Sequence, residues 1–219
     1  MKQSTLRLVI GFSICLVLGL LFGYLTTTFS DTTMPKFDET LISAIQGLET
    51  PWLTKIMKIF TWIGSGYIVG TITVIAALLL FFVYKMHRQA VLLVVVILGT
   101  VALKHYLKLY FKRERPTFHQ LVDAPEFSFP SGHTMMALGL YVMIVYIAWR
   151  HAKTSWLKCL FVLFATFMII MIGTSRIYLG VHFPSDVVGG ILASGFLVTI
   201  AVMVDGLFHN RSSKNEASS

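Results

Sequence analysis

The chain has 219 residues; 56% of them are hydrophobic, only 13% are charged, and the net charge at pH 7 is +8. The mean hydropathy is +0.76, and the apolar runs are far longer than the core of a soluble domain needs. This composition excludes an ordinary soluble domain and predicts an all-α, polytopic membrane protein. No segment of the sequence indicates a nucleic-acid partner or an obligate protein partner.

Windows of about 20 apolar residues predict six membrane-spanning helices in one bundle. The expected spans are residues 8–29, 61–84, 90–107, 134–149, 156–174 and 187–208. The first run resembles a signal peptide, because Lys2 and Arg7 precede it. Its length of about 22 residues and the lack of a small-residue cleavage site favour a retained helix. We expect residues 1–209 to form a single six-helix membrane domain and residues 210–219 to be a polar, disordered tail.

Residues 30–60 connect the first two spans and are polar to amphipathic. Apolar residues recur there at helical spacing, at Phe37, Leu41, Ile45 and Leu48. This pattern predicts a short helix that lies in the membrane interface. Two interpretations of it stay open: an extramembrane helix that packs on the bundle, or a lid or lipid gate.

Six spans place both termini on one side of the membrane, together with the basic segments 85–88 and 150–158. The positive-inside tendency predicts that this side is cytoplasmic. Lys and Arg nevertheless divide about evenly between the two faces, because four of them follow the third span, and we set this cluster aside as an anion-binding site. By the same parity, the connection between spans three and four emerges on the same face as the connection between spans five and six.

The first of these connections begins with a basic motif. Lys108 and Arg115 are seven residues apart, so on a helix they share a face, with Lys104 and Lys112 on the same stripe. Pro116 disfavours helical geometry at Arg115, which suits a cation on the turn where the helix unwinds. The motif favours an anion site; the alternative is a headgroup-binding anchor at a helix end.

A second motif, Pro130-Ser131-Gly132-His133, directly precedes the fourth apolar run. Ser131 is a natural N-cap, and Gly132 allows a ligand to approach the backbone. The N–H groups at the helix start can therefore hold phosphate oxygens, with His133 in the first turn. The alternative is a plain N-cap followed by an interfacial histidine.

The third motif lies between spans five and six and contains Arg176, His182 and Asp186. The arginine offers a planar fork for phosphate oxygens. The histidine offers a nitrogen nucleophile, and the aspartate can hold its other ring nitrogen. The alternatives are a helix-start acid that answers the macrodipole and an interfacial histidine bonded to the backbone.

In their order, spacing and membrane side, the three motifs resemble those of the type 2 phosphatidic acid phosphatase family. The family signatures Lys-x6-Arg-Pro, Pro-Ser-Gly-His and Ser-Arg-x5-His-x3-Asp stand without substitution at residues 108–116, 130–133 and 175–186. The resemblance covers about residues 60–208, includes the six-span layout, and is greatest to the small bacterial members.

The resemblance implies a role for each residue. His182 would attack phosphorus and form a phosphohistidine, Asp186 would orient it, and His133 would protonate the leaving oxygen and then activate water. The family works without a metal or other cofactor. The residues implied to hold the phosphate oxygens are Lys108, Arg115, Ser131, Gly132 and Arg176.

Elementary chemistry agrees with these roles. Phosphoryl transfer asks mainly for positioning and charge stabilisation, which fixed cations can supply where other enzymes use magnesium. The two histidines need opposite protonation states, one neutral to attack and one charged to donate. A bell-shaped pH–rate profile is therefore predicted.

Three other interpretations stay open. A non-enzymatic phospholipid transporter would use the cations only to bind headgroups. A lipid phosphotransferase would pass phosphate from the same site to an acceptor other than water. A metal-dependent hydrolase is disfavoured, because the sequence has no H-E-x-x-H pair and the neighbouring cations repel a metal. Its candidate ligands would be His105, His119, His133, His182 and Asp186.

A site at a membrane face between apolar helices suits an amphiphile whose headgroup reaches the cations while its tails stay in lipid. Phosphatidylglycerol phosphate, undecaprenyl diphosphate, phosphatidic acid and diacylglycerol diphosphate all fit, and the first two are favoured. We expect a multi-pass protein of the cell membrane with cytoplasmic termini and, from the resemblance, an extracytoplasmic active site.

Overall fold

The fold was obtained as a computed structural model, which describes residues 2–27, 34–125 and 127–216. Over these ranges the regular structure is helical, and six helices are long and apolar enough to cross a membrane. The predicted all-α, six-span architecture is thus confirmed. The spanning helices are α1 (Lys2–Thr27), α4 (Gly66–Leu78) with its π-helical continuation η1 (Leu79–Val83), α5 (His87–Phe111), α6 (Gly132–His151), α7 (Ser155–Tyr178) and α8 (Pro184–Glu216).

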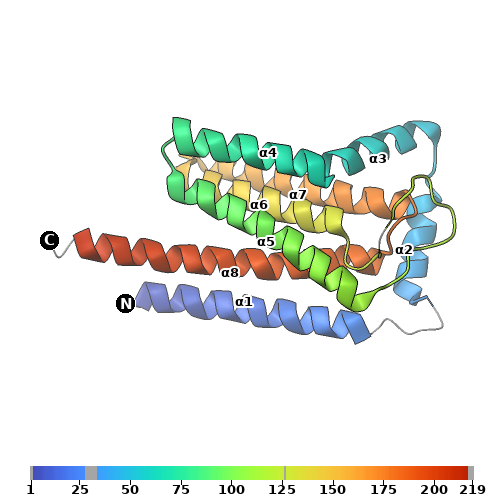
Figure 1. Ribbon diagram of the computed structural model, residues 1–219, viewed down its shortest axis with the longest axis horizontal. Coiled ribbons are helices and arrows are strands. Elements are labelled where there is room, and N and C mark those ends of the chain that lie inside the picture. Colours follow the sequence, from blue (N-terminus) through green and yellow to red (C-terminus); the bar gives the residue numbers. More distant parts are fainter. Residues whose placement is uncertain (1, 28–33, 126, 217–219) are drawn as a thin grey trace.

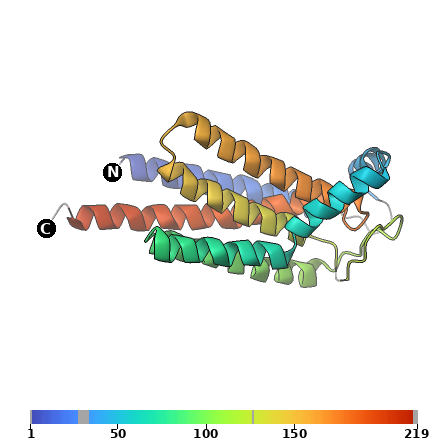
Figure 2. The ribbon, with the colours of Figure 1, turned by 90° about the horizontal axis from the view of Figure 1, so that it is seen from above.

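The long helices lie side by side along one direction (Figures 1 and 2). The start of α1 and the end of α8 lie at the same end of the bundle (Figure 1). The shorter helices α2 (Lys36–Gln46) and α3 (Pro51–Ile63) lie at the other end, with the long connection between α5 and α6. Every chemistry-bearing motif of the sequence belongs to this second end.

Helix α6 is the centre of the bundle, and α4, α5, α7 and α8 all pack against it. Of the six spanning helices it is the most buried, because its residues face protein on several sides rather than lipid. Its side chains Leu140 and Met143 are fully buried against Leu93 of α5 and Val198 of α8. The start of α6, which carries the second motif, is therefore held from all sides.

The second span differs from the sequence prediction at its start. The apolar run over residues 61–84 predicts one helix, whereas the chain ends α3 at Ile63 and begins α4 at Gly66. Ser65 caps α4, since its hydroxyl accepts from the N–H of Ile68 at 3.4 Å. Gly64 sits against the side chain of Ile172, which leaves no room for a Cβ. The result is a change of direction between α3 and α4 (Figure 2).

The segment after the first span also differs from the single short helix predicted. It forms two helices, and the buried face of α2 contains Asp38 and Ile42, whereas Phe37 and Leu48 of the predicted apolar stripe are exposed. The sequence predicted the wrong buried face for this helix, because the hydrogen bonds of Asp38 with Arg113 and Ser185 decide which side of α2 faces the protein. Helix α2 packs against α7 and α8, as expected for a helix that packs on the bundle.

The polar residues after 209 were predicted to be disordered. Helix α8 instead continues to Glu216, and residues 217–219 lie outside the described part of the chain. A helix that is already formed in the apolar span can extend at little cost, because each added residue gains one backbone hydrogen bond. The division into one domain and a tail stays a prediction.

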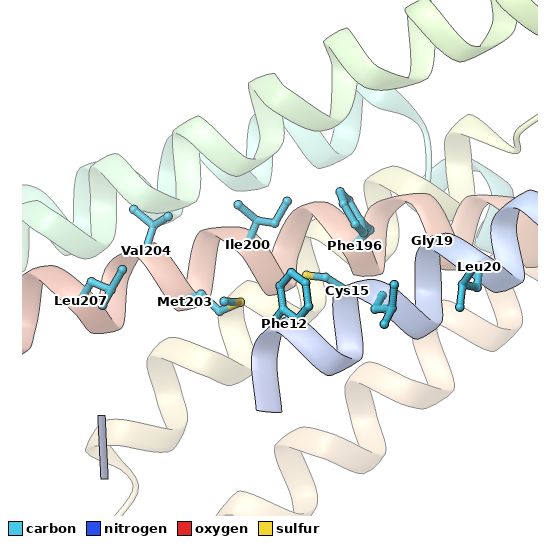
Figure 3. Close-up of a pocket in the computed structure, with 10 residues that line it drawn as sticks. Phe12, Cys15, Gly19, Leu20, Phe196, Ile200, Met203, Val204 and Leu207 are labelled. Carbon is cyan, nitrogen blue, oxygen red and sulfur yellow. The ribbon is translucent and has the colours of Figure 1, made fainter. Parts of the chain in front are cut away.

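Helix α1 packs along α8 at close distance. At Gly11 and Gly19 the chain has no side chain, and an added Cβ at Gly11 would meet Met203 of α8. Beside this contact lies a groove of about 520 Å³ (Figure 3), which is lined by apolar side chains, Gly19 and the thiol of Cys15. The groove offers no charged group in the described residues, so it suits lipid contact rather than chemistry.

A buried carboxylate, which the sequence analysis missed, lies near the end of the bundle opposite the motifs. Asp205 of α8 is 4% exposed. It pairs with Arg88 at 2.8 Å and Arg150 at 3.3 Å, and it accepts from the hydroxyl of Tyr146 at 2.7 Å. These bonds tie the start of α5 and the end of α6 to α8.

This cluster predicts a loss of stability for Asp205→Asn. The amide cannot pair with both arginines, but these are about one-third exposed and can be rehydrated. The expected loss is therefore that of a buried hydrogen-bond acceptor, about 1–3 kcal/mol. Thermal unfolding in detergent should show a Tm several degrees lower. The control Glu114→Gln removes an exposed carboxylate, and equal Tm values for the two variants would contradict the prediction.

Candidate active site

The connections that carry the motifs are bonded to each other. The N–H of Leu121 donates to the carbonyl of Leu179 at 3.0 Å, and the N–H of Ser131 donates to the carbonyl of Asp186 at 2.9 Å. The guanidinium of Arg115 donates to the carbonyl of Val181 at 2.5 Å. The α5–α6 and α7–α8 connections therefore meet on one face, as the parity of the spans predicts.

One glycine makes this meeting possible. Gly180 has a φ of +72°, a left-handed conformation that side chains disfavour, and a Cβ there would also strike the carbonyl of His119. The backbone of the α7–α8 turn can thus lie directly against the α5–α6 connection. This close approach brings His182, two residues later, under the α5–α6 connection.

The basic motif reaches the site partly as predicted: Arg115 lies beyond the end of the helix, as Pro116 indicated, but the predicted helical stripe does not continue to Lys112. Helix α5 ends at Phe111, and Lys112 adopts a left-handed conformation at φ 46°. Arg115 is therefore not on the helical stripe of Lys108, and Lys112 is exposed. The reversal at Lys112 nevertheless returns Arg115 to the cavity that Lys108 lines.

The cavity has a volume of about 450 Å³ and lies between the α3–α4 junction and helices α5, α6 and α7. Lys104 and the segment 122–125 also form part of its wall. Ser131 and Asp186 are fully buried behind this lining. The motif residues that line the cavity are Lys108, Arg115, Gly132, His133, Arg176 and His182.

The imidazole of His182 is 2% exposed and is contacted at both ring nitrogens. Nδ1 lies 3.2 Å from Oδ2 of Asp186, and Nε2 lies 3.1 Å from Nη1 of Arg115. A carboxylate only accepts and a guanidinium only donates, so these partners place the proton on Nδ1 and the lone pair on Nε2. Oδ2 of Asp186 also accepts from the N–H of Phe183 at 2.9 Å, which fixes the carboxylate.

The surroundings of His182 keep this ring neutral. Burial lowers its pKa well below the ordinary 6.5, and the positive charges of Arg176, Arg115 and Lys108 lower the pKa further. A hydrogen bond with the backbone of Ser128 acts in the opposite direction but is the smallest of these effects. A nucleophilic histidine has to be neutral, with a lone pair on the ring nitrogen that attacks; in His182 this nitrogen is Nε2.

Arg176 lies in the last turn of α7, although the sequence placed it after the span. It is 5% exposed, and its Nη1 donates to the hydroxyl of Thr61 at 2.6 Å. Its Nε has no hydrogen-bond partner among the described residues. Because buried donors are nearly always bonded, this N–H on the cavity wall indicates a place for an anionic oxygen.

The second motif starts α6 at Gly132, with Ser131 at the N-cap position as predicted. The predicted side-chain cap is absent from this described helix end, because the Ser131 hydroxyl accepts instead from the Thr134 hydroxyl at 2.9 Å. A Cβ at Gly132 would lie 2.6 Å from Cδ of Lys104, so the glycine lets this lysine pack against the helix start. His133 follows on the cavity wall, within electrostatic reach of Arg176 and His182.

Behind the cavity lies a group of residues that the motif analysis did not assign. Arg113 donates from Nη1 to Oδ1 of Asp186 at 2.6 Å and from Nη2 to Oδ2 of Asp38 at 3.1 Å. The sequence shows Arg113 as one member of the basic cluster after the third span, but it does not show which residues Arg113 binds. Asp38 gave no signal, because an acid in the first turn of a helix normally faces water.

The ligands considered for a metal-dependent hydrolase do not gather. His105 is exposed on α5, and His119 pairs with Glu49. Within the described ranges, no group of three His, Cys, Asp or Glu residues has the geometry to hold a metal ion. On the cavity side, the charged neighbours of His182 are Arg176, Arg115 and Lys108, and these cations disfavour a metal at this position. The expectation of a metal-free site stays a prediction.

Comparison with known proteins agrees with the motifs. Residues 89–208 match the PAP2 superfamily. Phosphatidylglycerophosphatase B of Bacillus subtilis is 34% identical over 175 residues, which cover 79% of this chain and 85% of that protein. Undecaprenyl-diphosphatase BcrC of the same organism is 31% identical over 105 residues, which cover 44% of this chain and 49% of that protein.

The fold has a solved counterpart as well. A crystal structure of a transmembrane PAP2-type phosphatidylglycerolphosphate phosphatase from Bacillus subtilis superposes with a TM-score of 0.81 at 31% identity. The superposition covers 87% of this chain and 95% of that one. The chain therefore belongs to the PAP2 superfamily, and the resemblance read from its three motifs is confirmed.

The charge environment of His182 generates a prediction for its titration. The protein is labelled at its histidines and titrated by NMR. The ring of His182 should stay neutral at pH 6.5 and become protonated only well below that pH. Replacing Arg176 with Gln removes one positive neighbour, so the midpoint should rise towards 6.5. His182→Ala identifies the resonance, and a wild-type midpoint at or above 6.5 would contradict the assignment.

Proposed function

We propose that this multi-pass member of the PAP2 superfamily is a lipid phosphatase that hydrolyses a lipid phosphate or diphosphate through a phosphohistidine. The observation that carries the proposal is the buried, neutral imidazole of His182, whose Nε2 lies 3.1 Å from a guanidinium that can bind phosphate. Binding alone would not require a nucleophile held in one tautomer by a buried carboxylate. This contact favours an enzyme over a lipid transporter.

In the first step, Nε2 of His182 attacks phosphorus while the bond from phosphorus to the lipid oxygen breaks. The Nδ1 proton stays on the ring, which becomes cationic and is stabilised by Asp186 at 3.2 Å. Arg115 must leave Nε2 for a phosphate oxygen before the attack. His133 donates a proton to the leaving lipid oxygen, which departs as an alcohol or as a lipid monophosphate.

In the second step, a water molecule attacks the phosphohistidine and His133 removes its proton. The bond between phosphorus and Nε2 breaks, so His182 returns to its neutral form and inorganic phosphate leaves. The low pKa of His182 favours its departure as a neutral ring. It also moves the acid limb of the predicted bell-shaped pH profile below the range of an ordinary histidine.

The cations hold the equatorial oxygens and take up charge in the transition state. Arg176 fits this role best, because its buried Nε has a hydrogen bond to give. Lys108 and Arg115 line the same cavity, as does the start of α6 at Gly132. Ser131 is fully buried, and its hydroxyl oxygen accepts from the Thr134 hydroxyl, so this bond does not use the O–H that Ser131 would donate to phosphate.

The substrate class follows from where the cavity lies. Its wall includes the ends of membrane-spanning helices and the α3–α4 junction, so a headgroup can reach the cations while its acyl or prenyl chain stays in lipid. The two relatives named above act on phosphatidylglycerol phosphate and undecaprenyl diphosphate, according to their names. We propose these two lipids as the substrates to be tested first.

The proposed orientation places this site on the extracytoplasmic face. The start of α1, the end of α8 and the basic segments at 85–88 and 150–158 belong to the opposite end of the bundle. The positive-inside tendency favours a cytoplasmic position for that end. The cations at the other end are needed for the phosphate, which explains why they do not follow this tendency.

The proposal predicts that purified protein releases inorganic phosphate from these lipids. His182→Ala should abolish release, because the nucleophile is lost, and His133→Ala should lower kcat by about 10²–10⁴-fold, because the general acid is lost. Released inorganic phosphate is measured with each of four lipids in micelles as the substrate: phosphatidylglycerol phosphate, undecaprenyl diphosphate, phosphatidic acid and diacylglycerol diphosphate. Transfer of phosphate to another lipid without release of free phosphate would indicate a phosphotransferase instead.

A matched control is His105→Ala, which removes an exposed histidine of α5 outside the cavity. Its activity should equal that of the wild type. The proposal fails if the wild type releases no phosphate from any of the four lipids, or if His182→Ala keeps wild-type activity while folded.

A separate prediction concerns metal ions. Because Lys108, Arg115 and Arg176 supply the positive charge that a divalent cation supplies elsewhere, activity should be unchanged after dialysis against EDTA. The measurement compares kcat with and without chelator, and then after addition of zinc or magnesium. Activity that disappears in EDTA and returns only with a metal would contradict it.

A further inference from the structure

Asp38 has an environment that is unusual for its position. It lies in the first turn of α2, yet its exposed fraction is 0%. Its Oδ1 accepts from the N–H of Ser185 at 2.7 Å, and its Oδ2 accepts from the Ser185 hydroxyl at 2.6 Å. Ser185 belongs to the first turn of α8, next to Asp186. Helix α2 is thus bonded directly to the helix start that orients His182.

Arg113 extends this contact to Asp186 itself. Its Nη2 donates to Oδ2 of Asp38 at 3.1 Å, and its Nη1 donates to Oδ1 of Asp186 at 2.6 Å and to the Ser185 hydroxyl at 2.7 Å. The guanidinium also lies over the ring of Phe183, 4.2 Å from its centroid. One planar group therefore spans two buried carboxylates and has a fixed orientation.

The other oxygen of Asp186 faces His182 at 3.2 Å. A continuous series of polar contacts thus leads from Asp38 through Arg113 and Asp186 to the imidazole. None of the cavity-lining cations belongs to it. The series lies behind the nucleophile, on the side away from the phosphate.

The charges of this series also matter. Asp38, Arg113 and Asp186 together carry a charge of −1, and without Asp38 the remaining pair would be neutral. When Nε2 bonds to phosphorus, the ring of His182 becomes cationic, and a neighbouring negative charge stabilises it. Asp38 balances Arg113, so that the charge of Asp186 is available to the ring.

We propose that Asp38 is a positioning residue for the reaction: it holds Arg113 so that Asp186 keeps both the place and the negative charge that His182 requires. This inference rests on the proposed phosphatase function. It also gives α2 a role, because this helix carries Asp38 and so helps to position His182.

The test starts with Asp38→Asn, which keeps one oxygen for the N–H of Ser185 but presents an N–H₂ group to Arg113. With phosphatidylglycerol phosphate as substrate, kcat should fall by about 10–100-fold, as is usual when the support of a reactive group is removed. KM and the inhibition constant of inorganic phosphate should not change, because Lys108, Arg115 and Arg176 are intact. The matched control Glu39→Gln removes an exposed carboxylate from the adjacent position of α2 and should leave kcat unchanged.

A second variant separates charge balance from simple structural support. Asp38→Asn with Arg113→Gln restores the charge of −1, because Asp186 is then the only charged member of the three. Its kcat should lie above that of Asp38→Asn, whereas losses at independent sites would multiply. A residue with only a structural role would give no such recovery.

Thermal unfolding shows which variants are folded. If Asp38→Asn does not fold, Arg113→Lys takes its place, since it keeps the charge but lacks the fork that spans both carboxylates; its kcat should fall at an unchanged phosphate inhibition constant. A folded Asp38→Asn variant with wild-type kcat, a loss matched by weaker phosphate binding, or a double variant without recovery overturns the inference. Failure of the proposed function is distinct, because the wild type itself would then release no phosphate.

Discussion

A guanidinium held between two buried carboxylates is the interaction on which the catalytic end of this bundle depends. Placing Asp38 and Asp186 out of water costs several kcal/mol for each ion unless their oxygens are matched by donors. Arg113 supplies a donor to each, and Ser185 and the N–H of Phe183 supply others. These donors come from the α5–α6 connection and the start of α8, and Asp38 comes from α2. Loss of any one partner would leave a charge buried and unmatched, so the three segments hold one another in place.

The membrane decides where such groups can lie. A charged side chain within a spanning helix is costly, and it is tolerated where it faces a cavity or an interface. Lys108 and Arg176 occupy the last turns of α5 and α7, where the negative end of the helix dipole favours a cation. The first turn of α6 meets them with the N–H groups of a helix start, which favour an anion. Long apolar helices thus deliver both kinds of phosphate-binding group to one surface, and the α5–α6 and α7–α8 connections bring them together.

The sequence predicted the parts of the structure that are encoded locally. Apolar runs gave the six spans, and short motifs gave the residues of the cavity, because each depends on neighbours within about one helix length. The break between α3 and α4 was missed, since Gly64 and Ser65 interrupt the helix without interrupting the apolar run. Asp38 could not be found for a different reason: its partners Arg113 and Ser185 are 75 and 147 residues away in the chain. A single sequence carries no record of contacts at that distance.

The site is arranged so that the proposed nucleophile, His182, is covered by Arg115, a proposed phosphate-binding group. Arg115 donates towards the lone pair of His182 Nε2, and the field of the cations keeps that ring neutral. A phosphate that enters the cavity offers Arg115 a charged acceptor in place of a neutral one, and charge-assisted hydrogen bonds are roughly twice as strong. It also offers an acceptor to the unbonded Nε of Arg176. In the proposed mechanism, substrate binding therefore uncovers Nε2 at the moment when phosphorus is within reach. The same exchange reverses when phosphate leaves, since the guanidinium can then donate to the imidazole again.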